Sequence, residues 1–186
     1  MIIVVSGLPR SGTSMMMKML EETDIPILTD KIREADEDNI KGYYEDERVK
    51  QLHQDNTWIS EAENKAVKVI SYQLRHLPSG HVYKIIFMKR NITEILASQR
   101  KMMQRRGEPQ DDVSETVMAN IFHKHLNETD QWLNKQPNMK ILYINYNETL
   151  YNPETTAEQV AKFLEQDLDI EKMIQIVDSR FYRQRK

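Results

Sequence analysis

The chain has 186 residues, a formal net charge of −3 and no cysteine. The length suits one domain with a hydrophobic core, and the small negative charge gives no support to general binding of nucleic acids or membrane surfaces. The lack of cysteine excludes disulfides, thiolate metal ligands and cysteine nucleophiles, and is typical of a reducing compartment. The first apolar run is too short for a signal peptide or a membrane span. We therefore expect one cytoplasmic domain over residues 1–186, without nucleic-acid partners or membrane insertion.

Short apolar runs recur along the chain and have the composition of buried parallel strands. They lie at 2–5, 25–28, 66–70, 82–88 and 140–146. Helical periodicity is found at 13–22, 93–105, 112–134 and in "NPETTAEQVAKFL" at 152–164. Strands that alternate with helices predict an α/β fold, in which a central parallel sheet is flanked by helices in three layers.

Local signals mark where some of these elements begin. "DVSE" at 112–115 resembles a capping box, which would start a helix at that point. Asn152 is the expected cap of the last helix, with Pro153 at its first position, where the missing N–H costs little. The polar stretch 29–48 is predicted to be an ordered surface loop.

The stretch "GLPRSGTS" at 7–14 joins the first strand to the first helix. Gly7, Gly12 and Ser14 stand where the glycines and the hydroxyl of a P-loop stand, but Thr13 replaces its lysine. The positive charge lies inside the loop instead, at Arg10. Such a turn directs backbone N–H groups and the positive end of a helix dipole at one point, so the sequence predicts an anion site.

The missing lysine bears on which group is transferred. In P-loop NTPases this lysine reaches the β and γ phosphates and Mg²⁺ neutralises the remaining charge. A sulfuryl group carries less charge than a terminal phosphoryl group, so one arginine and the backbone amides can suffice without a metal. Strand 82–88 also runs into Lys89 and Arg90 rather than an aspartate. We expect no metal site.

A second anion site is expected after strand 82–88. Arg90 stands at the end of this strand, and Ser98 lies eight residues later in the following helix. Residues at the carboxyl ends of parallel strands face the ligand crevice. Arg90 is therefore a candidate ligand for a second anionic group.

Together these features resemble the sulfotransferases that use 3′-phosphoadenosine 5′-phosphosulfate (PAPS), and small bacterial members in particular. "PRSGT" at 9–13 matches the family's 5′-phosphosulfate loop, and Arg90 followed by Ser98 matches its 3′-phosphate site. "YNETLYNP" at 146–153 is similar to its third segment. The three motifs occur in the family's order and cover most of the chain. The resemblance implies a P-loop-like fold, PAPS as co-substrate, 3′-phosphoadenosine 5′-phosphate (PAP) as product, and no metal.

The resemblance also implies roles for individual residues. Arg10 would reach toward the sulfuryl group, Arg90 and Ser98 would clamp the 3′-phosphate, and Tyr146 would lie near the adenine. The loop residues expected to hold the 5′-phosphate are Ser11, Gly12, Thr13 and Ser14. A basic C-terminal segment covers the 3′-phosphate in this family, and Arg183 and Arg185 are the candidates here.

The sequence leaves the general base and the acceptor open. The family's histidine base has no counterpart in the matching stretch, so the candidate bases are Asp30, Glu45 and Lys68. The acceptor hydroxyl (or amine) is expected to belong to a small molecule or carbohydrate, while phenols, lipid headgroups and peptides remain open, as does the oligomeric state. Two other classes also remain: an NTP-dependent kinase or hydrolase with a degenerate P-loop, and a non-catalytic nucleotide-binding module.

Overall fold

Five parallel strands form the centre of the molecule. The computed structural model describes residues 1–30, 32, 42–107 and 113–177. Within these ranges one sheet has the strand order β2-β3-β1-β4-β5, and every neighbouring pair is parallel. The strands are β1 (Ile2–Gly7), β2 (Ile27–Leu28), β3 (Ala66–Lys68), β4 (Tyr83–Lys89) and β5 (Met139–Asn145). All five predicted strands are confirmed, although β2 and β3 are shorter than the sequence suggests.

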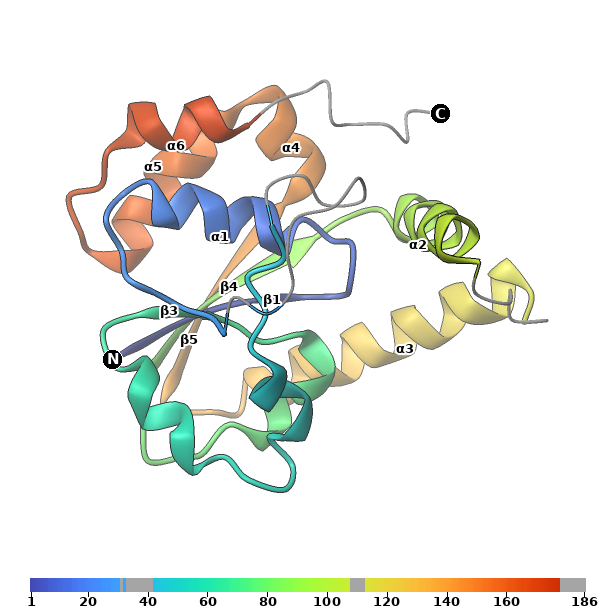
Figure 1. Cartoon of the computed structure of the whole chain (residues 1–186), viewed down its shortest axis with the longest axis horizontal. Coiled ribbons are helices and arrows are strands. Elements are labelled where there is room, and N and C mark those ends of the chain that lie inside the picture. Colours follow the sequence, from blue (N-terminus) through green and yellow to red (C-terminus); the bar gives the residue numbers. More distant parts are fainter. Residues whose placement is uncertain (31, 33–41, 108–112, 178–186) are drawn as a thin grey trace.

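Helices cover both faces of the sheet and complete the expected three layers (Figure 1). One face carries α1 (Thr13–Glu21), α4 (Tyr146–Tyr151), α5 (Pro153–Leu164) and α6 (Ile170–Ile176). The other carries α3 (Glu115–Leu133) and the short 3₁₀ helices η1 (Glu47–Gln51), η2 (Thr57–Ala62) and η3 (Ser71–His76). Helix α2 (Ile92–Arg106) extends beyond the end of β4.

The central strands are apolar because both of their faces are covered. All six residues of β1 are buried. Ile3 and Val5 belong to the core beneath α1, α5 and α6, whereas Ile2 and Val4 belong to the core beneath the 3₁₀ helices. Successive side chains of a strand point to opposite faces, so a continuous apolar run feeds both cores.

The N-termini of α3 and α5 can be compared with the capping signals predicted from the sequence. Helix α3 begins at Glu115 and its N-cap is Ser114, whose Oγ accepts from the Val117 N–H at 3.4 Å. The capping box predicted at 112–115 is therefore wrong, because the serine inside it is the cap; residue 112 itself lies outside the described residues. Asn152 and Pro153 do begin α5, but the Asn152 side chain makes no capping hydrogen bond.

Two parts of the chain differ from the sequence expectation. Helices α4 and α6 were not predicted; each has only six or seven residues, too few to show a clear period. Half of the predicted loop at 29–48 lies outside the described residues, and its last two residues already belong to η1.

The carboxyl ends of the strands bring distant segments to one edge of the sheet. Val5 of β1 is in register with Lys68 of β3, Gly7 with Met88 of β4, and Lys89 with Asn145 of β5. The residues that follow these strand ends therefore meet at one edge, where ligands of open α/β sheets bind.

Candidate nucleotide and sulfuryl site

Residues 7–14, which we call the glycine loop, need glycine at two positions. Gly7 has φ +145° and Gly12 has φ +103°, conformations that side chains rarely adopt. A Cβ on Gly7 would lie 2.4 Å from Ser11 Oγ, and a Cβ on Gly12 would lie 2.4 Å from Cδ2 of Tyr146. The loop is therefore packed closely against the neighbouring strand end and against Tyr146, and leads directly into α1.

Arg10 connects the glycine loop to helix α2. Its backbone has φ +73°, a left-handed conformation that costs a non-glycine residue about 1 kcal/mol or more. Its Nε donates to Ser98 Oγ at 3.0 Å. Arg90 in turn donates from NH1 to the Arg10 carbonyl at 3.0 Å. The two predicted anion-binding elements are thus in direct contact.

Arg90 is held between a carboxylate and an aromatic ring. Its Nε donates to Glu94 at 2.9 Å, its guanidinium carbon lies 4.4 Å from the centre of the Tyr146 ring, and its side chain is 8% exposed. Glu94 also accepts from the Asn147 side chain at 2.9 Å. Burial raises the pKa of Tyr146, while the nearby cations Arg90 and Arg10 oppose that rise. The structure thus brings together Arg10, Arg90, Ser98 and Tyr146, four of the residues that the sequence analysis proposes for the site.

Lys68 supplies a positive charge on the other side of the glycine loop. Its side chain is 7% exposed, and Nζ lies 2.7 Å from the Tyr43 carbonyl, 3.2 Å from Ser14 Oγ and 3.4 Å from Glu45 Oε1. The P-loop lysine is absent from the loop itself, yet a lysine from β3 reaches the loop hydroxyl. Two of the three candidate bases, Lys68 and Glu45, therefore lie together at the loop.

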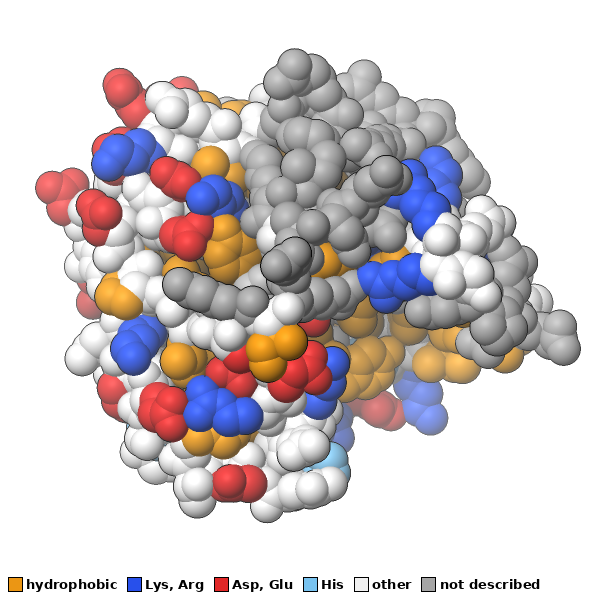
Figure 2. All heavy atoms as spheres, in the orientation of Figure 1, with side chains coloured by type: hydrophobic (Ala, Val, Ile, Leu, Met, Phe, Trp, Pro, Cys, Tyr) orange, Lys and Arg blue, Asp and Glu red, His pale blue; other side chains and the backbone are white. Residues whose placement is uncertain are grey.

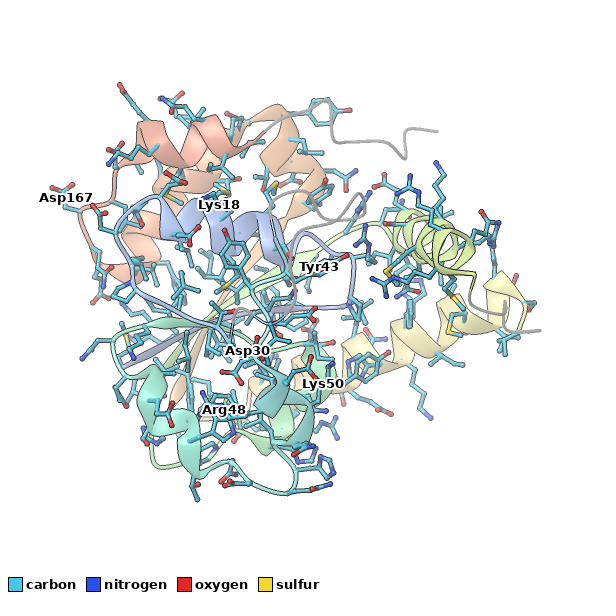
Figure 3. The ribbon with its side chains drawn as sticks, in the orientation of Figure 1. Lys18, Asp30, Tyr43, Arg48, Lys50 and Asp167 are labelled. Atoms are coloured by element: carbon cyan, nitrogen blue, oxygen red, sulfur yellow. The ribbon has the colours of Figure 1, made fainter. Side chains whose placement is uncertain are left out.

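Asp30, the third candidate base, faces the backbone. Its carboxylate oxygens accept from the N–H of Ile32 at 2.9 Å and of Glu47 at 2.7 Å. Its own N–H donates to the Glu45 carbonyl at 3.2 Å. Figure 3 shows Asp30 and Tyr43 between α1 and the short helices on the opposite face. Asp30 thus connects the chain after β2 to the start of η1.

The other residues predicted to bind the nucleotide are two from the glycine loop and α1 and two from the C-terminal segment. The Ser11 N–H donates to the Leu8 carbonyl at 3.1 Å, and its buried hydroxyl makes no hydrogen bond with any described residue. Thr13 is buried at the first turn of α1. Arg183 and Arg185 lie outside the described residues.

A histidine at the same edge was not singled out from the sequence. Nε2 of His125, on α3, lies 2.9 Å from Oγ of Ser71, which follows β3, and the His125 ring stacks on Tyr72 at 3.9 Å between centroids. Burial, with a smaller effect of Arg75, lowers the pKa of His125. The two partners are 54 positions apart, and no spacing rule connects residues at that separation.

Among the described residues we also looked for a metal-binding cluster, a membrane-spanning helix and a surface patch of one charge sign. Within the described ranges, no group of three or more histidines and acidic residues is arranged to hold a metal ion. None of the described helices is long and apolar enough to cross a membrane. Figure 2 shows acidic and basic side chains interspersed over the described part of the visible face, rather than a patch of one sign.

Comparison with solved structures shows the fold. Mouse sulfotransferase SULT7A1 complexed with PAP matches with a TM-score of 0.57 and 18% identity, over 96% of this chain and 63% of that one. The sulfotransferase domain from the curacin biosynthetic pathway matches with a TM-score of 0.55 and 14% identity, over 95% of this chain and 77% of that one. Retinol dehydratase complexed with retinol and PAP matches with a TM-score of 0.52 and 15% identity, over 97% of this chain and 69% of that one.

Comparison of the sequence with protein-family models identifies the family to which the chain belongs. This chain spans 63% of the mouse protein's length. No curated protein sequence matches it. The family model of the sulfotransferase domain, however, matches residues 2–186, which is nearly the whole chain. The chain belongs to the sulfotransferase domain family.

Proposed function

We propose that the chain transfers a sulfuryl group from PAPS to a hydroxyl or amine of a small-molecule or carbohydrate acceptor, and releases PAP. The observation that carries this proposal is the contact between two anion-binding elements, made by Arg10 with Ser98 and by Arg90 with the Arg10 carbonyl. PAPS carries anionic groups at both its 5′ and 3′ positions, so its recognition needs two such elements side by side. The family assignment and the PAP in the mouse structure support the same donor.

The residues at the sheet edge fit this nucleotide. The α1 N-terminus, with Thr13 and Ser14, would hold the 5′-phosphate through N–H and hydroxyl donors. Arg90 and Ser98 would hold the 3′-phosphate, with Arg90 giving charge-assisted hydrogen bonds. The ring of Tyr146 offers an apolar surface for adenine. Ser11 would support the turn, because its N–H already donates within the loop.

Transfer moves negative charge onto the leaving oxygen. A lone pair of the acceptor attacks sulfur, the bond from sulfur to the 5′-phosphate oxygen breaks, and PAP leaves with the electron pair. Arg10, in the loop, and Lys68, beside it, are cations that can stabilise this charge. Lys68 Nζ already lies within hydrogen-bonding distance of three acceptors, the full donor capacity of an ammonium group. We therefore propose that Lys68 acts as a cation and not as a base.

Glu45 is the proposed general base for a hydroxyl acceptor. Its side chain is 25% exposed and lies 3.4 Å from Lys68 Nζ, at the edge of the glycine loop. A carboxylate in this place can accept the acceptor's proton as the new S–O bond forms. Asp30 is the weaker candidate, since both of its oxygens accept backbone N–H groups.

Nucleotide binding separates this proposal from an NTP-dependent enzyme. In P-loop NTPases the hydroxyl at the Ser14 position holds Mg²⁺, but here the Lys68 amine lies 3.2 Å from it and would repel a divalent cation. In a thermal-shift comparison, PAP should stabilise the protein more than AMP or ATP with Mg²⁺; a ligand at 100 times its Kd adds about 2.7 kcal/mol. A larger shift with ATP and Mg²⁺ would overturn the donor assignment.

Transfer itself is tested by incubating the protein with PAPS and a metabolite extract. Mass spectrometry should find new sulfated products that depend on the protein and on PAPS. If PAP binds tightly but no product forms with any extract, the chain is a nucleotide-binding module without transferase activity.

A further inference from the structure

A cavity of about 460 Å³ lies on the β4 side of the glycine loop. Its walls come from the end of β4, the first turn of α2 and the middle of α3. Lys68 approaches the loop from β3 with Glu45 beside it, and the strand order places β1 between β3 and β4. The cavity is therefore separate from the position that we propose for the acceptor hydroxyl.

The glycine loop itself forms one wall of this cavity. Leu8 and Ser11, the lining residues from the loop, stand on either side of the Pro9–Arg10 pair. Ser11 is 1% exposed, and its hydroxyl has no hydrogen-bond partner among the described residues. Buried hydroxyls in folded proteins nearly always have a partner, and a bound water or ion explains some of the exceptions. This wall of the cavity thus contains an unsatisfied hydroxyl.

The charged groups of the cavity are already matched. Lys89 Nζ lies 3.1 Å from Asp130 Oδ2 and 3.9 Å from the centre of the Tyr143 ring. Asp130 Oδ1 accepts from the Tyr143 hydroxyl at 3.0 Å, and the Arg90 guanidinium, which we place in the nucleotide site, is paired with Glu94. An ionic ligand between α2 and α3 would compete with the Lys89–Asp130 pair, so the electrostatics there favour a neutral occupant.

The other lining groups combine hydrogen bonding with apolar surface. Asn91, His123 and Asn127 supply amide and imidazole groups that donate and accept. Met88, Ile95 and Leu126 supply apolar walls. Sugars have the same combination, with hydroxyls around a ring whose faces carry C–H groups. The volume lies within the range of small-molecule sites.

We propose that this cavity binds a neutral, hydroxyl-rich small molecule of the mono- or disaccharide class. The ligand lies against the outer side of the glycine loop and takes no part in the sulfuryl transfer step. Amides of Asn91 and Asn127 and the imidazole of His123 bind its hydroxyls, while the apolar walls contact its C–H faces. The proposal concerns binding alone and goes beyond the proposed transferase activity.

Ligand-observed NMR titration of the whole chain tests this site. The probes are glucose, N-acetylglucosamine and cellobiose, with sodium sulfate and sodium acetate as ionic probes. At least one sugar should bind the wild type saturably, and Asn127→Ala and His123→Ala should each raise its Kd at least fivefold. Asn120→Ala is the matched control, because Asn120 is exposed on the same helix and outside the cavity. Failure of all three sugars, tighter binding of an ionic probe, or an unchanged Kd in Asn127→Ala overturns the proposal.

A parallel PAP titration separates this site from the proposed function. Asn127 and His123 are exposed on α3, and neither is among the residues that we propose to bind PAP, so both variants should bind PAP as the wild type does. If neither the wild type nor the variants bind PAP, but the sugar binds as expected, the transferase proposal fails and the cavity proposal stands. Lost PAP binding in Asn127→Ala alone would mean that Asn127 supports the nucleotide site, which also overturns the cavity proposal.

Discussion

Arg10 donates from Nε to Ser98 Oγ at 3.0 Å, although 88 positions separate the two residues in the sequence. In the proposed complex, Arg10 lies at the sulfuryl end of the donor nucleotide and Ser98 at its 3′-phosphate end. Arg90 holds the same loop through the Arg10 carbonyl. One connected set of side chains therefore spans both ends of the expected ligand, and its members can be tested one at a time.

Arg90→Ala should discriminate between nucleotides. Loss of a charge-assisted contact costs roughly 1.5 to 3 kcal/mol, so the Kd of PAP should rise roughly 10-fold to 100-fold. The Kd of AMP, which lacks the 3′-phosphate, should rise much less. Calorimetric titration measures both. Arg100→Ala is the matched control, since Arg100 lies on the same helix and pairs with Glu115 at the surface. Equal losses for PAP and AMP would mean that Arg90 serves folding.

Arg10→Gly should be more stable than Arg10→Ala. Both variants remove the side chain and its bond to Ser98, but only glycine adopts φ +73° without strain. The free energy of unfolding of the glycine variant should be higher by about 1 kcal/mol. Urea unfolding of the two variants without ligand measures the difference. A more stable alanine variant would contradict the left-handed conformation of Arg10.

Arg10→Ala should slow transfer even at saturating PAPS. The loop amides and the Thr13 and Ser14 hydroxyls remain to bind PAPS. The charge that develops on the leaving oxygen, however, loses the Arg10 guanidinium as a hydrogen-bond donor. Removing one such donor costs roughly 3 kcal/mol, about a hundredfold in rate. Arg10→Lys should recover part of the loss, because lysine keeps the charge without the planar fork. Single-turnover assays with an identified acceptor measure this, and an unchanged saturated rate would reduce Arg10 to a binding residue.

Lys68→Met should slow transfer and also destabilise the protein. It leaves the Tyr43 carbonyl and Glu45 without their buried cation, which costs about 3 kcal/mol of unfolding free energy. Lys84→Met is the matched control. Lys84 is also buried on the sheet and binds the Leu164 carbonyl at 3.0 Å, at the end of α5. Both variants should lose stability in urea unfolding, but only Lys68→Met should lose single-turnover rate, by about a hundredfold. Equal rates in the two variants would exclude a catalytic role for Lys68.

His125 should make the protein less stable at mildly acidic pH. Its pKa is lowered in the folded state by burial and by Arg75, so protonation favours the unfolded chain, in which the pKa is about 6.5. The unfolding free energy should fall as the pH drops from about 7.5 to the lowered folded value, and level off below it. His125→Gln should reduce this fall, whereas exposed His53→Gln should not. Urea unfolding at pH 7.5 and 5.5 compares the three proteins, and identical falls in all of them would contradict the lowered pKa.

The strands, the glycine loop, and the positions of Arg90 just after β4 and Ser98 on the following helix could all be predicted from the sequence alone. These features are local. A buried parallel strand must be apolar on both faces, and a loop with φ of +145° and +103° needs glycine. Ser98, eight residues after Arg90, lies on the helix that follows the strand. The short helices α4 and α6 escaped prediction because they contain less than two full turns.

Which distant groups meet became clear from the fold and not from the sequence. Lys68 lies at Ser14, and His125 lies at Ser71, across 54 positions in each case. The sequence also made Asp30 and Glu45 equal candidates, but the fold turns Asp30 onto backbone N–H groups and Glu45 toward Lys68. The reason is that strand order and register choose the neighbours of each strand end, whereas apolar periodicity reports only that a strand is buried. The order β3-β1-β4 places a cation on one side of the glycine loop and a cavity on the other.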